Sequence, residues 1–191
     1  MLVHPRNVVF EDLRISQSAL AKCPQRGPAL RSAVNAEIRD ARITGSAVVE
    51  VGGWVLAEKM RRSTEAVRLA LGVWAWCRMI GGAVGLATAT FRNHSACILG
   101  RIGGHPLRHN GEPILQYFEP KFGCDIQILR FASDAYSPRY TSIVESMCYE
   151  LSLWPVLSAH SGSSFPLCRL HDAIHETAPI RVSPREAVFT A

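Results

Sequence analysis

The fold is decided by residues 50–107, which read EVGGWVLAEKMRRSTEAVRLALGVWAWCRMIGGAVGLATATFRNHSACILGRIGGHPL. Valine and tryptophan before the basic RRST loop predict a strand near 48–57. The apolar residues after that loop predict a buried helix over 64–80, which Gly81-Gly82 ends. Small and β-branched residues over 84–91 predict a second strand, and a short helix to Ile102 follows it.

The flanking sequence adds fewer elements. Spacings of four predict helices over 29–41 and 142–153, and 124–131 reads as a strand. A strand, a long apolar helix and a second strand predict an α/β (α+β) fold with a mixed sheet flanked by helices. Residues 1–40 are weakly patterned. We expect one domain over 1–157 with its core in 41–157, and a poorly packed C-terminal tail over 158–191.

Composition narrows the class of protein. The 191 residues are 48% apolar and 19% charged, which are the proportions of a globular domain. No apolar run reaches the roughly 18 residues of a membrane span, and the first residues lack the apolar region of a signal peptide. We therefore expect a cytoplasmic protein with no membrane span. The six cysteines form no C-x-x-C motif, so reduced thiols are expected.

The net charge of +5 favours an anionic partner. The basic residues are scattered and match no nucleic-acid fingerprint, so phosphates of a cofactor or an acidic carrier protein fit better than nucleic acid. His171 and His175 have the spacing of metal ligands, but no third ligand accompanies them. We expect no metal.

The loop before the long helix is the candidate anion site. Arg61 and Arg62, with the backbone of Ser63, Thr64 and Glu65, can hold a phosphate because the first N–H groups of a helix are unpaired and its dipole favours negative charge. Ser63 or Thr64 can cap the helix. The alternative is a solvated basic turn.

Two glutamates are candidate bases. Glu50 lies in the first predicted strand, where apolar surroundings would raise its pKa into a useful range. Glu58 is the second choice. Both can instead be ordinary carboxylates: Glu50 at a solvent-facing edge, and Glu58 paired with Arg61 or Lys59.

Arg92, Asn93 and Ser95 follow the second strand, and ligands of open α/β sheets bind at the carboxyl ends of strands. Asn93 and Ser95 can also serve simply as helix caps.

This layout resembles the GNAT-type N-acyltransferase superfamily, whose members hold the pyrophosphate of an acyl thioester on a loop of the form R/Q-x-x-G-x-G/A. Arg61 and Ala66 match that loop, whereas Thr64 stands at the glycine position. In the superfamily's second motif, N-x-x-A-x-x-x-Y-x-x-x-G-F, the matching residues are Asn93, Ala96 and Gly104. Gly100 replaces the tyrosine that often protonates the leaving thiolate, and His105 replaces the phenylalanine.

The phrases GGWVLAEKMRRSTEA and GLATATFRNHSA resemble more closely the N-acyl amino acid synthases and acyl-homoserine-lactone synthases. This resemblance implies a GNAT-like fold with a shortened or diverged N-terminal half. It also implies acyl transfer from acyl carrier protein or CoA to a small-molecule amine, with acyl-CoA or acyl-phosphopantetheine as co-substrate. The alternative is a non-catalytic GNAT-fold descendant that acts as an acyl-carrier or protein-binding module.

Overall fold

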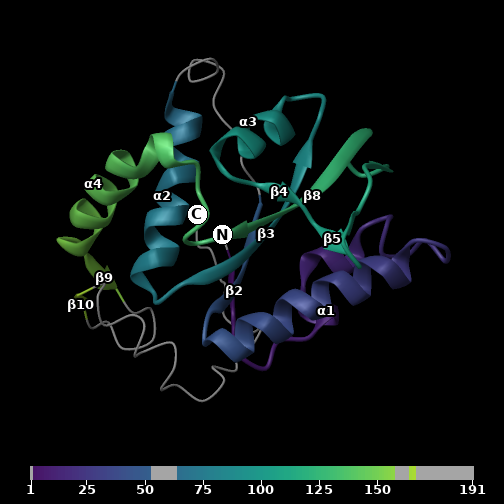
Figure 1. Cartoon of the computed structure of the whole chain (residues 1–191), viewed down its shortest axis with the longest axis horizontal. Coiled ribbons are helices and arrows are strands. Elements are labelled where there is room, and N and C mark those ends of the chain that lie inside the picture. The colour runs from purple at the N-terminus through teal and green to yellow at the C-terminus, as the bar shows by residue number, and fades with distance from the viewer. Residues whose placement is uncertain (1, 53–63, 158–163, 167–191) are drawn as a thin grey trace, which may run out of the picture.

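The computed structural model describes residues 2–52, 64–157 and 164–166. Its centre is a mixed sheet of six strands in the order β1-β2-β3-β8-β4, with β7 also paired to β8 (Figure 1). These strands are β1 (Leu2–His4), β2 (Ala47–Val51), β3 (Ala83–Thr90), β4 (His105–Pro106), β7 (Tyr117–Glu119) and β8 (Cys124–Ala132). The predicted mixed sheet flanked by helices is therefore confirmed at the level of an α+β architecture.

Four α-helices are described: α1 (Gly27–Thr44), α2 (Glu65–Met79), α3 (Ser95–Ile102) and α4 (Thr141–Ser152). Three short 3-10 helices are η1 (Phe10–Asp12), η2 (Arg14–Gln17) and η4 (Pro138–Tyr140). Two small hairpins lie outside the main sheet and pair β5 (Arg108–His109) with β6 (Glu112–Pro113) and β9 (Pro155–Leu157) with β10 (Ser164–Pro166).

The sheet combines both kinds of strand pairing. β2 and β3 are parallel, from Ala47–Ala83 to Val51–Ala87, and α2 is the crossover between them. β1 joins β2, and β8 joins β3, in antiparallel fashion. The parallel pair therefore lies inside the sheet.

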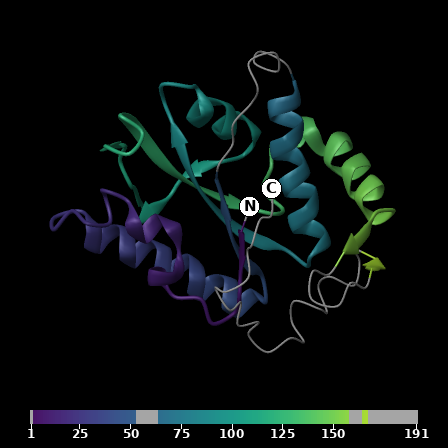
Figure 2. The same cartoon turned by 180° about the vertical axis from the view of Figure 1, so that it is seen from behind.

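Side chains alternate between the two faces of this sheet. Val48 and Leu86 pack in one cluster with α1, whereas Val49 packs with α2. Ala87 and Ala89 pack with α2 and α3 on that second side. Figures 1 and 2 show α1 on one side of the sheet and α2 on the other, with α4 outside α2.

Most predicted elements occur within a few residues of their expected bounds. The helix predicted over 29–41 is longer in the structure, where α1 begins at residue 27 and continues through residue 44. Gly45, with φ of 70°, ends it in the left-handed conformation that glycine tolerates. The predicted strand near 48–57 is β2, while residues 53–57 lie outside the described residues.

The helix over 64–80 is α2, and its packing is less complete than predicted. Trp74 is buried and Trp76 is half-buried, but Leu69 is 57% exposed. The expectation that at least one of the two tryptophans is buried is confirmed. Within the described residues, no helix combines the length and the apolar character needed to cross a bilayer.

Residues 1–40 contribute more to the core than their weak patterning predicted. Five residues that precede α1 are buried against α1 and the sheet: Val8, Phe10, Leu13, Ile15 and Leu20. They come from turns and 3-10 helices, which have no long apolar period for sequence inspection to detect. Residues 108–123, where the sequence predicted no helix or strand, likewise contain the short strands β5, β6 and β7.

Candidate functional site

The carboxyl ends of the parallel strands β2 and β3 form the first part of the candidate site. Among the described residues, pairing between them extends to Val51–Ala87, and β3 continues through Thr88, Ala89 and Thr90. Ligands of open α/β sheets bind at such ends. The end of β3 is therefore a place where a ligand can meet strand backbone.

Backbone hydrogen bonds show which groups face this end. The N–H of Phe91 donates to Asp125 of β8, and the N–H of Thr90 donates to Ser95 Oγ at 2.8 Å. Successive backbone groups of a strand point to opposite sides. Thr88 therefore directs its N–H and C=O, like Thr90, toward the β2 side. The pairing of Val51 with Ala87 uses the Thr88 N–H, so the Thr88 C=O is the group here that can accept from an amide of an extended ligand.

The start of α2 lies at the same ends of the strands. Thr64 occupies the N-cap position, but its side chain makes no capping hydrogen bond. The prediction that its hydroxyl caps the helix is therefore wrong. Glu65 begins the helix, and its carboxylate lies 3.8 Å from Arg68 Nη1. Four predicted residues of this region lie outside the described residues: Glu58, Arg61, Arg62 and Ser63.

The turn between β3 and α3 contains the other predicted ligand residues. Arg92 and Asn93 are exposed there, whereas Ser95 is half-buried. The hydroxyl of Ser95 accepts a hydrogen bond from the Thr90 N–H and donates one to the Thr90 carbonyl at 3.0 Å. It therefore closes the strand-to-helix turn. The N-cap position of α3 is His94, with φ of 57°, and the capping roles predicted for Asn93 and Ser95 are wrong.

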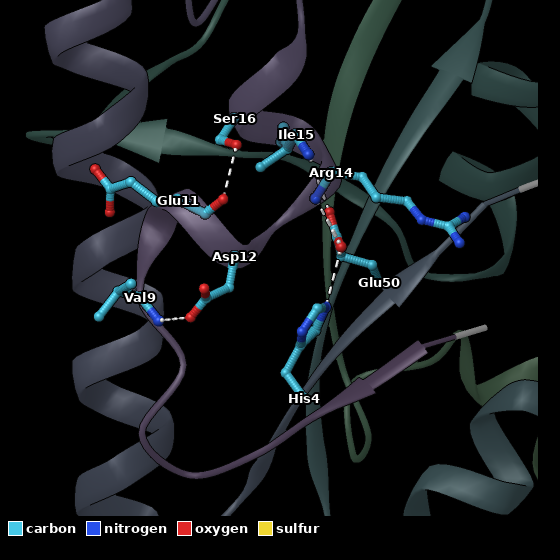
Figure 3. Close-up of polar contacts among 8 residues, drawn as sticks. All are labelled: His4, Val9, Glu11, Asp12, Arg14, Ile15, Ser16 and Glu50. Carbon is cyan, nitrogen blue, oxygen red and sulfur yellow. Dashed lines mark hydrogen bonds and ion pairs between the residues drawn. The ribbon is translucent and has the colours of Figure 1, made fainter. Parts of the chain in front are cut away.

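Glu50 lies near the end of β2, not at its start, and faces α1. Its side chain is 10% exposed. Oε2 lies 3.0 Å from His4 Nε2 and accepts the Arg14 N–H at 3.0 Å, and Oε1 accepts the Ile15 N–H at 3.1 Å (Figure 3). Glu50 therefore joins β1, β2 and η2.

The expectation that Glu50 has a raised pKa is wrong. Burial raises the pKa of its carboxyl group, but the hydrogen bond to His4 and those from two backbone N–H groups outweigh burial and lower it. Glu50 is ionised at neutral pH and is a weak base. An ionised carboxylate only accepts, so His4 donates from Nε2.

His4 is a candidate functional residue that sequence reasoning missed. An imidazole that is oriented by a carboxylate is the arrangement of a general base, because the carboxylate fixes the tautomer. The three residues of β1 are too few to give a periodic pattern, so no signal in the sequence marked His4. The side chain of Arg14 extends away from the Glu50 carboxylate and past the end of β2 (Figure 3).

The sheet separates the candidate site residues into two groups. Glu50, His4 and Arg14 lie on the α1 face. The starts of α2 and α3 lie on the opposite face, where Ala66 and Ala96 are buried. The sheet therefore lies between the two groups.

Comparison with known proteins adds nothing to this geometry. No family model, characterised protein or solved structure matches the chain. The acyltransferase family therefore stays a prediction from the quoted motifs. Among the described residues, no group of histidine, cysteine and acidic side chains could hold a metal ion. His171 and His175 lie outside them.

Proposed function

We propose that this protein is an N-acyltransferase, which moves an acyl group from a thioester of acyl carrier protein or CoA to an amine, with amino acids among the acceptors. One observation supports this most: among the described residues of the parallel β2–α2–β3 unit, β2 ends at Val51, whereas β3 extends three residues beyond the paired Ala87, to Thr90. An extended phosphopantetheine arm has amides, one of which can donate to the Thr88 carbonyl. The proposed compartment is the cytoplasm.

The donor would approach from the face of α2 and α3. Its phosphates would be bound by Arg61 and Arg62 with the backbone of Ser63, and by Arg92 and Asn93 at the start of α3. Guanidinium groups and helix N-termini both favour phosphate. Glu65 reduces the positive charge at the α2 start, so the arginines would supply most of the attraction.

The acceptor amine would approach from the α1 face. Its nitrogen lone pair attacks the thioester carbon, a C–N bond forms, and the C–S bond breaks with its electron pair leaving as thiolate. The proton lost by nitrogen passes to Nδ1 of His4, while Glu50 orients the imidazole. A pantetheine thiolate can leave without a proton near pH 8, since thiols titrate at about 8.5. Gly100 therefore does not exclude the chemistry.

The alternative is a non-catalytic descendant of the same fold that binds an acyl carrier or a protein. The environment of Glu50 favours this alternative, because three donors of the protein engage its carboxylate and its lowered pKa makes it a poor base. In that case the His4–Glu50 pair is structural.

Mass spectrometry of reactions between the purified chain, acyl-CoA or acyl carrier protein, and a panel of amino acids tests the proposal. The expected product is an N-acyl amino acid, formed with release of one thiol per acyl group. His4→Gln should lower kcat by about 10²–10⁴, with the loss shrinking at higher pH as free amine accumulates. Donor binding without turnover would favour the non-catalytic alternative. If the chain showed no donor binding and no turnover, both proposals would be excluded.

The donor site has its own variant. Changing Arg61 and Arg62 together to Ala should weaken donor binding by about 2–4 kcal/mol, taking each charged hydrogen bond at about 1.5–3 kcal/mol with a discount for exposure. Lys121→Ala, at an exposed position before β8, is the control for loss of positive charge. Equal donor affinity in all three proteins by calorimetry would remove the two arginines from the site.

A further inference from the structure

A second candidate site lies on the α1 face, away from the starts of α2 and α3. A groove of about 470 Å³ runs between α1 and the β5–β6 hairpin. Its rim carries Arg31 and Arg39 from α1, and Arg108 and His109 from the hairpin. Figure 1 shows this hairpin above the middle of α1, on the side of the sheet away from α2.

The sequence explains why a groove forms there. Ala33 and Ala36 place small side chains on the part of α1 that faces the hairpin, which leaves space beneath it. Arg31 and Arg39 are eight residues apart, which is two turns plus about 80°, so they project from neighbouring sides of the helix and flank the groove. The groove has a small apolar floor and basic walls.

The turn of the hairpin fixes the opposite wall. Asn110 and Gly111 have φ angles of 51° and 84°, and they separate the register pair of His109 with Glu112. Positive φ at both central residues is the pattern of a two-residue type I′ turn, which Asn-Gly favours. Arg108 Nη1 donates to the Gly111 carbonyl at 2.6 Å and so is held beside this turn.

The guanidinium on the other wall is also positioned. Arg31 lies 4.7 Å from the centre of the Phe10 ring and pairs with Glu11. Arg39 makes no hydrogen bond or ion pair with any residue that the structure describes. No carboxylate lies among the residues that line the groove. Each guanidinium has five N–H donors, so even the two engaged arginines keep donors for a ligand.

We propose that this groove binds a polyphosphate group, either as the free inorganic ion or as part of a small phosphorylated metabolite. Guanidinium forks match phosphate oxygens in pairs, and arginine is the usual residue for such recognition. The volume lies within the range of about 300–1,000 Å³ that is usual for small-molecule sites. No phenylalanine, tyrosine or tryptophan is among the residues that line the groove, so the phosphates and not a stacked base provide most of the affinity. This site is independent of acyl transfer.

Titration calorimetry with inorganic tripolyphosphate and with a nucleoside triphosphate tests the proposal. We expect one polyphosphate per chain. Arg39→Gln and Arg108→Gln should each weaken binding about tenfold, which corresponds to about 1.4 kcal/mol, and the double variant about a hundredfold. Tighter binding of the nucleotide would identify a phosphorylated metabolite as the source, and equal binding would identify the free ion.

A charge-matched control separates the groove from general attraction to a basic protein. The control Arg101→Gln/Lys121→Gln removes the same charge from exposed positions on α3 and before β8. Its affinity should change less than twofold. An equal loss in control and groove variants, or no binding by the unmodified chain, would overturn the proposal. So would binding of duplex DNA but not of tripolyphosphate, with the same dependence on Arg39 and Arg108.

Discussion

Oε1 of Glu50 accepts the backbone N–H of Ile15 at 3.1 Å across 35 positions of sequence. The same carboxylate takes the N–H of Arg14, and Oε2 of Glu119 takes the N–H of Ala19 at 2.9 Å. Glu50 and Glu119 are both buried. Two sheet carboxylates thus supply acceptors for backbone N–H groups that the 3-10 helices and turns of this segment do not use.

Glu50→Gln should lower the free energy of unfolding by about 1–3 kcal/mol at pH 7. The amide replaces one accepting oxygen of the carboxylate with an NH₂ donor, which then faces the donors that the carboxylate had bound. Because the folded-state pKa of Glu50 is lowered, its stabilisation is complete above the unfolded value of about 4.3 and is lost as pH falls through the folded value. Urea unfolding at several pH values measures both effects.

The variant should therefore show a shallower loss of stability on acidification than the unmodified chain. Glu145→Gln, on the exposed surface of α4, is the matched control. Parallel stability curves for the Glu50 variant and the unmodified chain across this acid range would contradict the assignment.

Trp74 links α2 to the end of β8. Its Nε1 donates to the Ala132 carbonyl at 2.9 Å, and its ring meets Phe131 edge-on at 4.8 Å between centroids. Trp74→Phe should cost about 0.5–1.5 kcal/mol for the hydrogen bond, plus a smaller packing loss. Trp74→Ala should cost about 3–5 kcal/mol because it empties a buried site. Chemical denaturation measures both, and equal costs would show that packing does not dominate.

Two glycines near the end of α3 give a matched pair. A Cβ on Gly104 would lie 2.6 Å from Phe131 Cε1, whereas a Cβ on Gly100 would meet nothing within 4 Å. Gly104→Ala should destabilise by about 1–3 kcal/mol through overpacking. Gly100→Ala should stabilise by up to about 1 kcal/mol, because alanine is the better helix former. The order of their melting temperatures checks this, and the reverse order would contradict it.

The cysteines should differ sharply in reactivity. Burial raises the pKa of Cys77 to about 12, whereas Cys97 is exposed on α3. At pH 8, iodoacetamide should modify Cys97 readily and leave Cys77 unmodified until the chain unfolds, because the thiolate is the reactive form. Peptide mass spectrometry after timed labelling provides the measurement. Equal labelling rates in the folded protein would show that α2 opens easily.

The predictable part of the fold is the part with long apolar periods. Helices α1, α2 and α4 and strands β3 and β8 follow from spacings of four or from β-branched runs within one element. The strand β1 has three residues, and its partner β2 lies more than 40 positions later, so no local pattern specifies this pairing. The strands β5 and β7 pair with nearby strands, but with two or three residues they are too short to show a period.

The candidate site was less predictable than the fold. The sequence indicated Glu50, but its partners His4, Arg14 and Ile15 come from residues 35–46 positions earlier. The sign of a pKa shift depends on which donors reach the carboxylate, and apolar sequence neighbours do not reveal those donors. Sequence reasoning could propose the residue but not its protonation state.

The bond between Ala19 and Glu119 also sets an order of events during synthesis. Ribosomes add about 5–20 residues per second, so Glu119 is made on the order of 5–20 s after Ala19, 100 positions earlier. Until then Val8, Leu13 and Leu20 lack part of the surface that buries them. A chaperone has its longest opportunity to bind this chain at its first apolar segment, and a truncation before β7 should leave that segment exposed to proteases.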